Sequence, residues 1–348
     1  MLDFIPWMDE IHIVEMGRLI LTGGAVDTIL ASKDGVPYIP LYYLGPCLHE
    51  ILFRTFGQIG VRISPLIGLA ATAFFFNRWL NRTYSLRRRT LLLLTLTALT
   101  APLLVQSTRL VRVDNWVFAC VFAVLVILGR SGQASRTTGS LVAAGAIAAA
   151  SAFIWPTAIL PAILFPAICF GTRQKREFAI FLLSGAVTVI LLILPVRRQL
   201  LDMVSAFGTY ADSSHPGTFS PVNVAIPFVK ETLRGPFLMA LSAFGFGFWL
   251  ASRRWAMIAA FLLALLLGIA SNLHTFRFIF LTPFFLVMAA DAIAWMERRT
   301  PRLSLALLTI TALYGIITGP LAYLIAPHET ISSQTESALL ADAGQDLV

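Results

Sequence analysis

Charged residues are scarce in this chain. Only 13% of its 348 residues are Asp, Glu, Lys or Arg, whereas a soluble domain carries roughly a quarter. Hydrophobic residues make up 57% of the chain, and the mean hydropathy is +0.80. This composition excludes an ordinary soluble enzyme and predicts a polytopic membrane protein.

Cysteine and nucleotide-binding motifs are also missing or sparse. Cys47, Cys120 and Cys169 are isolated and lack C-x-x-C spacing, so neither a disulfide framework nor a zinc site is expected. Neither a G-x-G-x-x-G fingerprint nor a P-loop occurs, so a nucleotide-sugar donor has no visible binding motif. The first residues, MLDFIPWMDE, have neither a basic start nor an apolar core, so no cleavable signal peptide is predicted.

The net charge of +8 does not indicate a nucleic-acid partner. Nearly all the basic residues are arginines in short clusters between apolar runs. No basic arm and no basic patch interleaved with aromatic residues is present, so binding to a phosphate backbone is not expected. The distribution instead follows the positive-inside pattern of membrane proteins, whose partner is the lipid bilayer.

Ten apolar runs organise the chain. They lie at 64–80, 91–106, 116–129, 139–155, 157–170, 178–195, 236–251, 255–271, 277–295 and 303–326. Several are shorter than the ~20 residues that a perpendicular helix needs, so flanking residues must extend them. Only Trp155-Pro156 separates 139–155 from 157–170, which form either one broken hairpin or two short spans. We expect an all-α bundle of about ten transmembrane helices.

These runs divide the chain into five parts. The predicted parts are an outer segment at 1–63, six spans at 64–195, a second outer loop at 196–235, four spans at 236–326 and a flexible tail at 327–348. Within the spans, Gly245 and Gly247 are expected to permit close helix packing. Asp291 is expected to form a local ion pair near Glu297 and Arg298.

Basic residues orient the predicted bundle. Fifteen of them lie in the short connections on one side: Arg78, Arg82, Arg87, Arg88, Arg89, Arg130, Arg136, Arg173, Lys175, Arg176, Arg253, Arg254, Arg298, Arg299 and Arg302. The positive-inside rule predicts that this side is cytoplasmic. Both termini and the two long segments then lie outside, and a bacterial inner membrane is the expected location.

An acidic pair, Asp9-Glu10, stands just before the first span. Carboxylates are costly near a bilayer, so a pair at this place calls for a chemical explanation. Within residues 10–23, apolar side chains such as Val14 and Leu21 are set against charged ones such as Glu15 and Arg18. This is the pattern of a short amphipathic helix lying at the interface. The alternative explanation is structural, because acids at a helix N-terminus interact favourably with the helix dipole.

The order of these features resembles the GT-C superfamily of membrane glycosyltransferases, such as protein O-mannosyltransferases and aminoarabinose transferases of lipid A. Its acidic motif and interfacial helix are matched by DEIHIVEMGRLILTGG, and its Tyr/Pro stretch by VPYIPLYYLGP. Arg112-Val113-Asp114 and HTFRFIFLTP match two later motifs. The family's first span has no counterpart here, nor does the soluble C-terminal domain of the mannosyltransferases with large outer domains. We favour the explanation that a span preceding Met1 is missing, and the alternative is that the short start is translocated unaided.

The resemblance implies sugar transfer from a polyprenyl-phosphate carrier to a glycan, lipid or protein acceptor at the outer face. Asp9 is the expected general base, with Glu10 as helper, orienter or metal ligand. Arg277 is the first candidate for binding the lipid phosphate, and Lys33, Arg197 and Arg198 are further candidates.

No cofactor is required, but a divalent metal is a further hypothesis. Asp9, Glu10, His12, His49 and Glu50 mix carboxylate and imidazole groups in the first segment, although no spacing demands a metal.

Two other functions compete with this prediction. A transporter or lipid-carrier flippase is the first, although ion-coupled carriers keep ionisable groups at mid-membrane and no predicted span has one at its centre. A non-catalytic scaffold is the second, and it would not need the acidic pair.

Arg109, Arg112 and Asp114 are expected to form an ion pair that ties a short outer turn.

Overall fold

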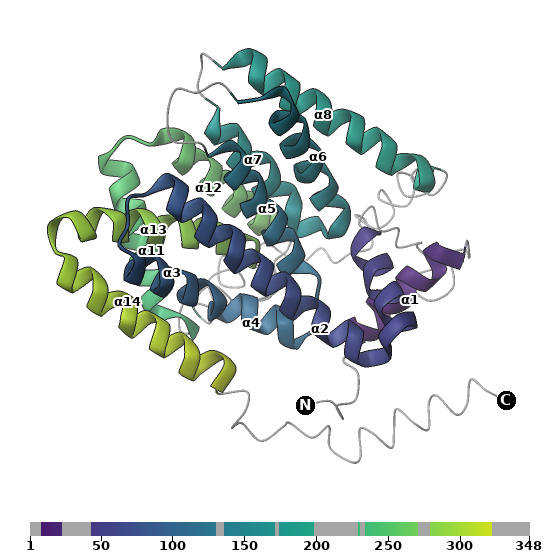
Figure 1. Cartoon of the computed structure of the whole chain (residues 1–348), viewed down its shortest axis with the longest axis horizontal. Helices are drawn as coiled ribbons and strands as arrows, with labels where there is room; N and C mark the ends of the chain where they lie inside the picture. Colours follow the sequence, from purple (N-terminus) through teal and green to yellow (C-terminus); the bar gives the residue numbers. More distant parts are fainter. Residues whose placement is uncertain are drawn as a thin grey trace.

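The computed structural model describes residues 8–22, 43–129, 136–170, 174–197, 229, 234–270 and 279–321. Within these ranges all regular secondary structure is helical, which confirms the predicted all-α class (Figure 1). In its described part, each of the ten apolar runs falls on one helix, on the bent pair α3 and α4, or on a helix and its adjoining short turn.

Twelve α-helices and three shorter helical turns are considered within the described residues. The first part of the chain forms α1 (Met8–Thr22), α2 (Leu44–Thr83), α3 (Arg88–Leu99), α4 (Pro102–Arg109), α5 (Asp114–Leu128), α6 (Thr138–Ile154), α7 (Ile159–Cys169) and α8 (Lys175–Ile193). The second part forms α11 (Pro236–Ala251), α12 (Trp255–Ala270), α13 (Thr282–Arg299) and α14 (Pro301–Ile316). Short turns η2 (Pro156–Ala158), η3 (Leu194–Val196) and η5 (Ile317–Leu321) adjoin α7, α8 and α14.

Several of these helices have the length and composition of membrane spans. Among the described residues, Leu44–Thr83, Lys175–Val196, Ile279–Arg299 and Pro301–Gly319 qualify individually, and α3 with α4 qualifies as a pair bent by 46°. Helices α5, α6, α11 and the Trp255–Leu266 part of α12 are apolar but shorter. Four or five membrane-length helices are compatible with an integral membrane protein, and the ten-span arrangement stays a prediction.

Proline marks the start of four helices. Pro102, Pro236, Pro283 and Pro301 occupy the first or second position of α4, α11, α13 and α14. Proline suits these positions because its fixed φ matches the helix and its missing N–H would have had no partner in the first turn. Each of these prolines therefore favours the start of the helix in which it lies.

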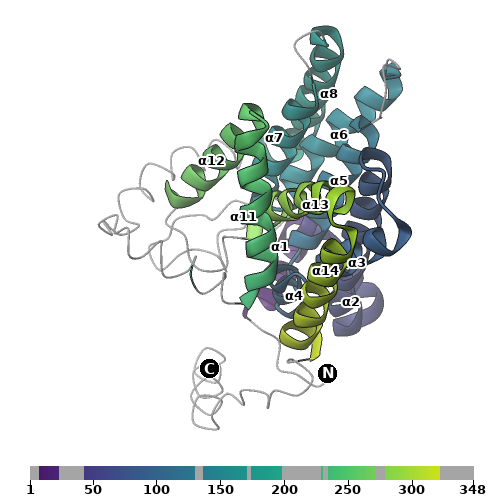
Figure 2. The ribbon, with the colours of Figure 1, turned by 90° about the vertical axis from the view of Figure 1, so that its left-hand side faces the viewer.

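Helix α13 forms the centre of the bundle. Its most apolar stretch is 94% buried, whereas that of α8 is 11% buried. Figure 2 shows α13 between α11 and α14. On α13, the ring of Phe284 stacks on Phe165 of α7 at 4.6 Å and contacts Phe261 of α12 at 5.8 Å between centroids. By contrast, α8 lies at the edge of the bundle and exposes Leu183 and Ile190.

Small residues bring α11 close to α13. A Cβ atom on Gly245 would overlap the carbonyl oxygen of Met288. One turn away, the Ser242 hydroxyl donates to the carbonyl of Phe285 at 3.0 Å. The expected packing role is therefore confirmed for Gly245. It is wrong for Gly247, where an added Cβ would meet no atom within 4 Å.

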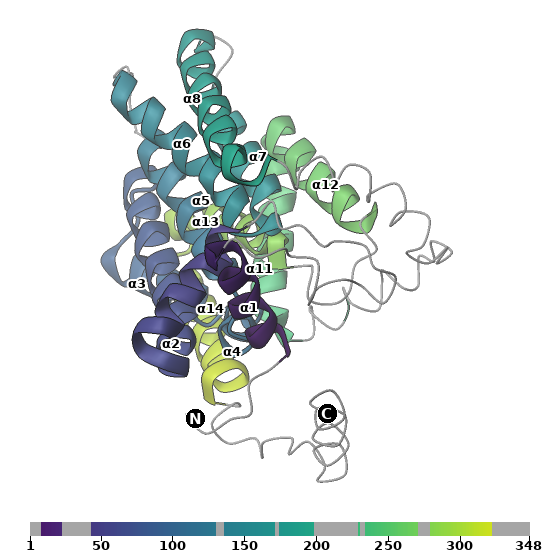
Figure 3. The same cartoon turned by 90° about the vertical axis from the view of Figure 1, so that its right-hand side faces the viewer.

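The bundle has two distinct ends. At what we call the α1 end, α1 lies against the first turns of α2 (Figure 3), and Val14, Val61 and Val111 cluster there. At what we call the arginine end, the α2–α3 and α11–α12 connections meet the last turns of α13, where Tyr84 and Arg254 both bind Asp291. A helix rises about 1.5 Å per residue, so α2 spans roughly 35 Å between Val61 and Tyr84.

We expect Gly245→Ala to lower the thermal midpoint of the detergent-purified protein, because its methyl group must displace the α13 backbone. Overpacking of this kind costs about 1–3 kcal/mol. Gly247→Ala is the matched control on the same helix. It should leave the midpoint unchanged or raise it, since alanine favours a helix by about 1 kcal/mol over glycine. Equal midpoints for the two variants would contradict the packing described for Gly245.

Candidate functional site

The acidic pair belongs to a helix that is docked on α2. Asp9 and Glu10 lie in the first turn of α1, which confirms the predicted helix, and their side chains lie outside the described structure. A Cβ on Gly17 would overlap the carbonyl of Pro46 and approach the Cβ of Glu50, so α1 rests directly on the α2 backbone. This contact holds the helix that carries the pair at the α1 end.

A buried carboxylate lies beneath this contact. Glu50 is 1% exposed, and its Oε1 accepts hydrogen bonds from Nε of Arg54 at 2.7 Å and Nε of Arg18 at 3.3 Å. Both arginine side chains are about half exposed, at 52% and 48%. The Arg18 guanidinium also lies over the ring of Phe53, 5.8 Å from its centroid. Two guanidinium groups thus share one carboxylate, which leaves a charge of +1.

The terminal nitrogens of Arg18 and Arg54 bear on what this arrangement can bind. Within the described residues, Arg18 and Arg54 each use only Nε for hydrogen bonding, so their terminal NH groups have no partner there. Guanidinium NH groups bind phosphate and carboxylate oxygens in strong, charge-assisted hydrogen bonds. The arrangement therefore has the chemistry of an anion site on a buried acidic anchor.

His49 adds further unpaired polar atoms next to Glu50. Its side chain is fully buried, and among the described residues neither ring nitrogen has a hydrogen-bond partner, nor does Oε2 of Glu50. The described residues hold no group of three His, Cys, Asp or Glu suited to a metal ion. Since the side chains of Asp9, Glu10 and His12 lie outside the description, the metal hypothesis stays a prediction.

A second buried carboxylate lies at the α4–α5 turn. Asp114 is 0% exposed and accepts hydrogen bonds from Arg112 Nε at 2.9 Å, Ser107 Oγ at 3.3 Å and Thr157 Oγ1 at 3.0 Å. The Arg112 guanidinium covers the Trp155 ring at 5.2 Å. The predicted ion pair is confirmed for Arg112 and Asp114, and it joins the turn to the break between α6 and α7.

The same turn contains a strained residue. Val111 has a φ of +54°, an outlier for a β-branched side chain. Such a conformation costs about 1–3 kcal/mol and persists only where the surroundings impose it. Here the surroundings are Val14 of α1 and Val61 of α2, against which Val111 is buried. The strain therefore lies where α1 meets the turn that carries Arg112 and Asp114.

The predicted phosphate-binding cations are only partly described. Arg197 follows η3 and is exposed, and its neighbour Val196 packs with Tyr43 and Phe153. Since Tyr43 begins α2 and its hydroxyl donates to Leu192 of α8 at 3.0 Å, Arg197 lies at the α1 end. Lys33, Arg198 and Arg277 lie outside the described residues.

Sequence reasoning missed Arg18 and Arg54 as site residues. One signal was present, because Glu50 and Arg54 stand four residues apart, where helical side chains meet. The other contact, between Arg18 and Glu50, joins residues 32 apart and depends on the docking of α1.

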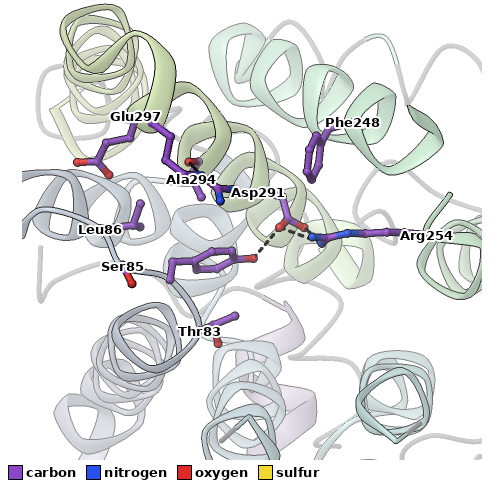
Figure 4. A pocket seen from close by; sticks show the side chains of 10 residues that line it. Thr83, Ser85, Leu86, Phe248, Arg254, Asp291, Ala294 and Glu297 are labelled. Atoms are coloured by element: carbon purple, nitrogen blue, oxygen red, sulfur yellow. Dashed lines mark hydrogen bonds and ion pairs between the residues drawn. The ribbon is translucent and has the colours of Figure 1, made fainter. Parts of the chain in front are cut away.

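At the arginine end, the sequence-based interpretation of Asp291 needs correction. Its ion-pair partner is Arg254, at 2.9 Å, and not Arg298. Figure 4 shows the Arg254 guanidinium against Asp291. Trp249 Nε1 and the Tyr84 hydroxyl also donate to Asp291, at 2.7 and 3.0 Å. Arg298 is seven residues further along α13, and a separation of that size places it about 10 Å along the axis.

The Tyr84 hydroxyl acts as a donor in this network. Burial, and secondly the nearby Asp291 carboxylate, raise the pKa of Tyr84 well above its ordinary value. The hydroxyl therefore stays protonated at neutral pH. It ties the α2–α3 connection to the central helix.

Fold and site together define a class: an all-α protein with several membrane-length apolar helices and buried carboxylates that bind arginines at both ends. No protein-family model, curated protein or solved structure matches the chain.

We expect Asp114→Asn to destabilise the protein, because the charge-assisted hydrogen bond from Arg112, which is only 17% exposed, would lose its negative acceptor. Removing one partner of a buried pair costs about 3–5 kcal/mol. The measurement is the thermal midpoint in detergent, and Arg112→Gln combined with Asp114→Asn should recover part of the loss. A single variant as stable as the wild type would show that the pair does not hold the turn.

Proposed function

We propose that the chain is a polytopic membrane glycosyltransferase of the GT-C type, with about ten spans. It transfers a sugar from a polyprenyl-phosphate carrier to an acceptor at the outer face. One observation supports this most directly: two half-exposed arginines share the buried Glu50, and one of them, Arg18, belongs to the same helix as Asp9 and Glu10. A base and a phosphate-binding group are the two things that this reaction needs.

The reaction can be assigned to these residues step by step. The acceptor hydroxyl attacks the anomeric carbon while its proton passes to the Asp9 carboxylate, with Glu10 orienting it. The bond between that carbon and the phosphate oxygen breaks, and its electron pair stays on the lipid phosphate. Arg18 and Arg54 bind the departing phosphate through their terminal nitrogens, where charge-assisted hydrogen bonds are strong.

Arg197 would add a further cation at the same end of the bundle. Arg277, Lys33 and Arg198 keep their proposed role in binding the same phosphate. The acceptor, whether glycan, lipid or protein, is not specified by these residues.

The order of the helices supports the proposed topology. Each apolar run corresponds to a helix or a bent pair, and the α2–α3, α11–α12 and α13–α14 connections carry arginine clusters. With that end cytoplasmic, as the positive-inside rule predicts, the α1 end faces outward. A bacterial inner membrane would then present the site to the periplasmic side.

We expect Asp9→Asn to reduce sugar transfer by about 10²–10⁴-fold, the usual contribution of a general base. The assay measures sugar release from a panel of polyprenyl-phosphate sugars by the purified protein. Glu10→Gln should cost less, since Glu10 only orients the base. Unchanged turnover in Asp9→Asn would remove the base assignment. Activity with nucleotide sugars alone would overturn the lipid donor.

Arg18→Ala and Arg54→Ala should weaken use of the lipid-linked donor. Each removes charge-assisted hydrogen bonds worth about 1.5–3 kcal/mol, which corresponds to a loss of tenfold or more in kcat/KM. Arg54→Lys should recover only part of the activity, because lysine lacks the planar fork of arginine. Arg78→Ala, an exposed arginine near the opposite end of α2, is the control. Equal losses for all three alanine variants would contradict a phosphate site at Glu50.

A further inference from the structure

A pocket of about 370 Å³ opens at the arginine end, remote from the α1 end. Its walls come from the α2–α3 connection, the α11–α12 turn and the last turns of α13 (Figure 4). The polar side chains that matter for ligand binding are Ser85, Arg254 and Arg298. Cavities of this size hold small ligands or lipid headgroups.

The carboxylates of this pocket are already bound within the protein. Both oxygens of Asp291 accept from Arg254, and each also accepts from Tyr84 or Trp249. Asp291 is 3% exposed and therefore offers no acceptor to a ligand.

Glu297 is equally occupied. Its Oε1 accepts from the Thr90 hydroxyl at 2.9 Å and from the Arg87 backbone N–H at 3.2 Å. Its Oε2 is buried without a partner and has no accessible surface toward a ligand. Thus neither acid of the pocket can bind a cation or an amine as the side chains stand.

Hydrogen-bond donors, in contrast, are left over. Arg254 uses only one terminal nitrogen, for Asp291, and Arg298 uses only Nε, for the carbonyl of Ala294. Within the described residues their other guanidinium nitrogens have no partner, and Ser85 adds a hydroxyl. The net charge of the pocket is +1, from three arginines and two carboxylates: Arg254, Arg298 and the nearby Arg87, and Asp291 and Glu297. A pocket with spare donors and a positive charge fits an anion with several oxygens.

Arg254 is held firmly in place for such a role. Its guanidinium bonds to both Asp291 oxygens, at 2.9 and 3.0 Å, and lies over the Phe248 ring at 5.2 Å. The preceding residue, Arg253, has a φ of +53°, which costs about 1 kcal/mol or more for a non-glycine residue. This turn lets the Arg254 backbone N–H bond to the Trp249 carbonyl at 2.9 Å. The side chain is thus fixed before any ligand arrives.

We infer that this pocket binds the phosphate group of an anionic phospholipid in the leaflet at the arginine end. The pocket opens among helix ends, where headgroups lie if the long helices cross the bilayer. Apolar surface continues on α11, where Phe244, one turn from the pocket-lining Phe248, is 45% exposed and can lie against an acyl chain. The positive-inside rule makes this leaflet the cytoplasmic one, whose anionic lipids bind basic pockets. This inference does not depend on sugar transfer.

Native mass spectrometry of the full chain in detergent tests the inference, with phosphatidylglycerol as the probe. Arg298→Ala should raise the dissociation constant of the first bound lipid about tenfold, the loss of a charge-assisted hydrogen bond. Arg302→Ala, an exposed arginine of the same α13–α14 connection that does not line the pocket, should bind like the wild type. Arg254→Lys should also weaken binding while it keeps a positive charge beside Asp291.

Three further probes test whether the pocket recognises the phosphate group, the acyl chains or both. Diacylglycerol, which lacks phosphate, should bind far more weakly than phosphatidylglycerol, as should glycerol 3-phosphate and inorganic phosphate, which lack acyl chains. Tight binding of either soluble phosphate would overturn the lipid assignment in favour of a soluble phosphate ester. Equal affinities of Arg298→Ala and Arg302→Ala would overturn the pocket itself, as would equal binding of diacylglycerol.

Discussion

Buried carboxylates that bind donors from other segments are the interaction on which this helical bundle depends. Glu50 joins α1 to α2, Asp114 joins the α4–α5 turn to η2, and Asp291 joins α13 to the connections on either side. An unpaired charge in an apolar interior is very costly, so each acid fixes the segment that supplies its partner. Apolar contacts alone pack helices in many registers. These pairs select one of them.

Buried carboxylates bind arginines at both ends of the bundle, but the two arrangements differ. At the arginine end, Asp291 is fully satisfied and holds one arginine rigidly beside a pocket. At the α1 end, Glu50 holds two arginines through one oxygen, and the terminal nitrogens of both have no partner among the described residues. In each case a carboxylate orients guanidinium groups whose remaining donors have no partner within the described residues. The difference lies in what surrounds them: a cavity at one end and the helix that carries the acidic pair at the other.

The sequence predicted features that depend on near neighbours. The apolar runs became helices because a helix satisfies the backbone hydrogen bonds of an apolar segment within that segment, and residues 10–22 lie in α1, as their helical period predicted. The Arg112–Asp114 pair was foreseen because the two residues are two apart. The Arg18–Glu50 and Arg254–Asp291 pairs were not, because residues 32 and 37 apart meet only through helix packing. No periodicity encodes which helix faces which.

The geometry at Glu50 differs from that of a simple arginine–carboxylate ion pair. A structural arginine–carboxylate pair gains most from two parallel hydrogen bonds to both oxygens. Here two arginines compete for Oε1 through Nε, while Oε2 stays buried without a partner. This arrangement stabilises the fold less than a fully paired carboxylate would, since an unsatisfied buried oxygen costs about 1–3 kcal/mol. Hydrogen bonding through Nε leaves the edge formed by the two terminal nitrogens of each guanidinium without a partner among the described residues. The proposed phosphate would bind at that edge, where it need not displace Glu50.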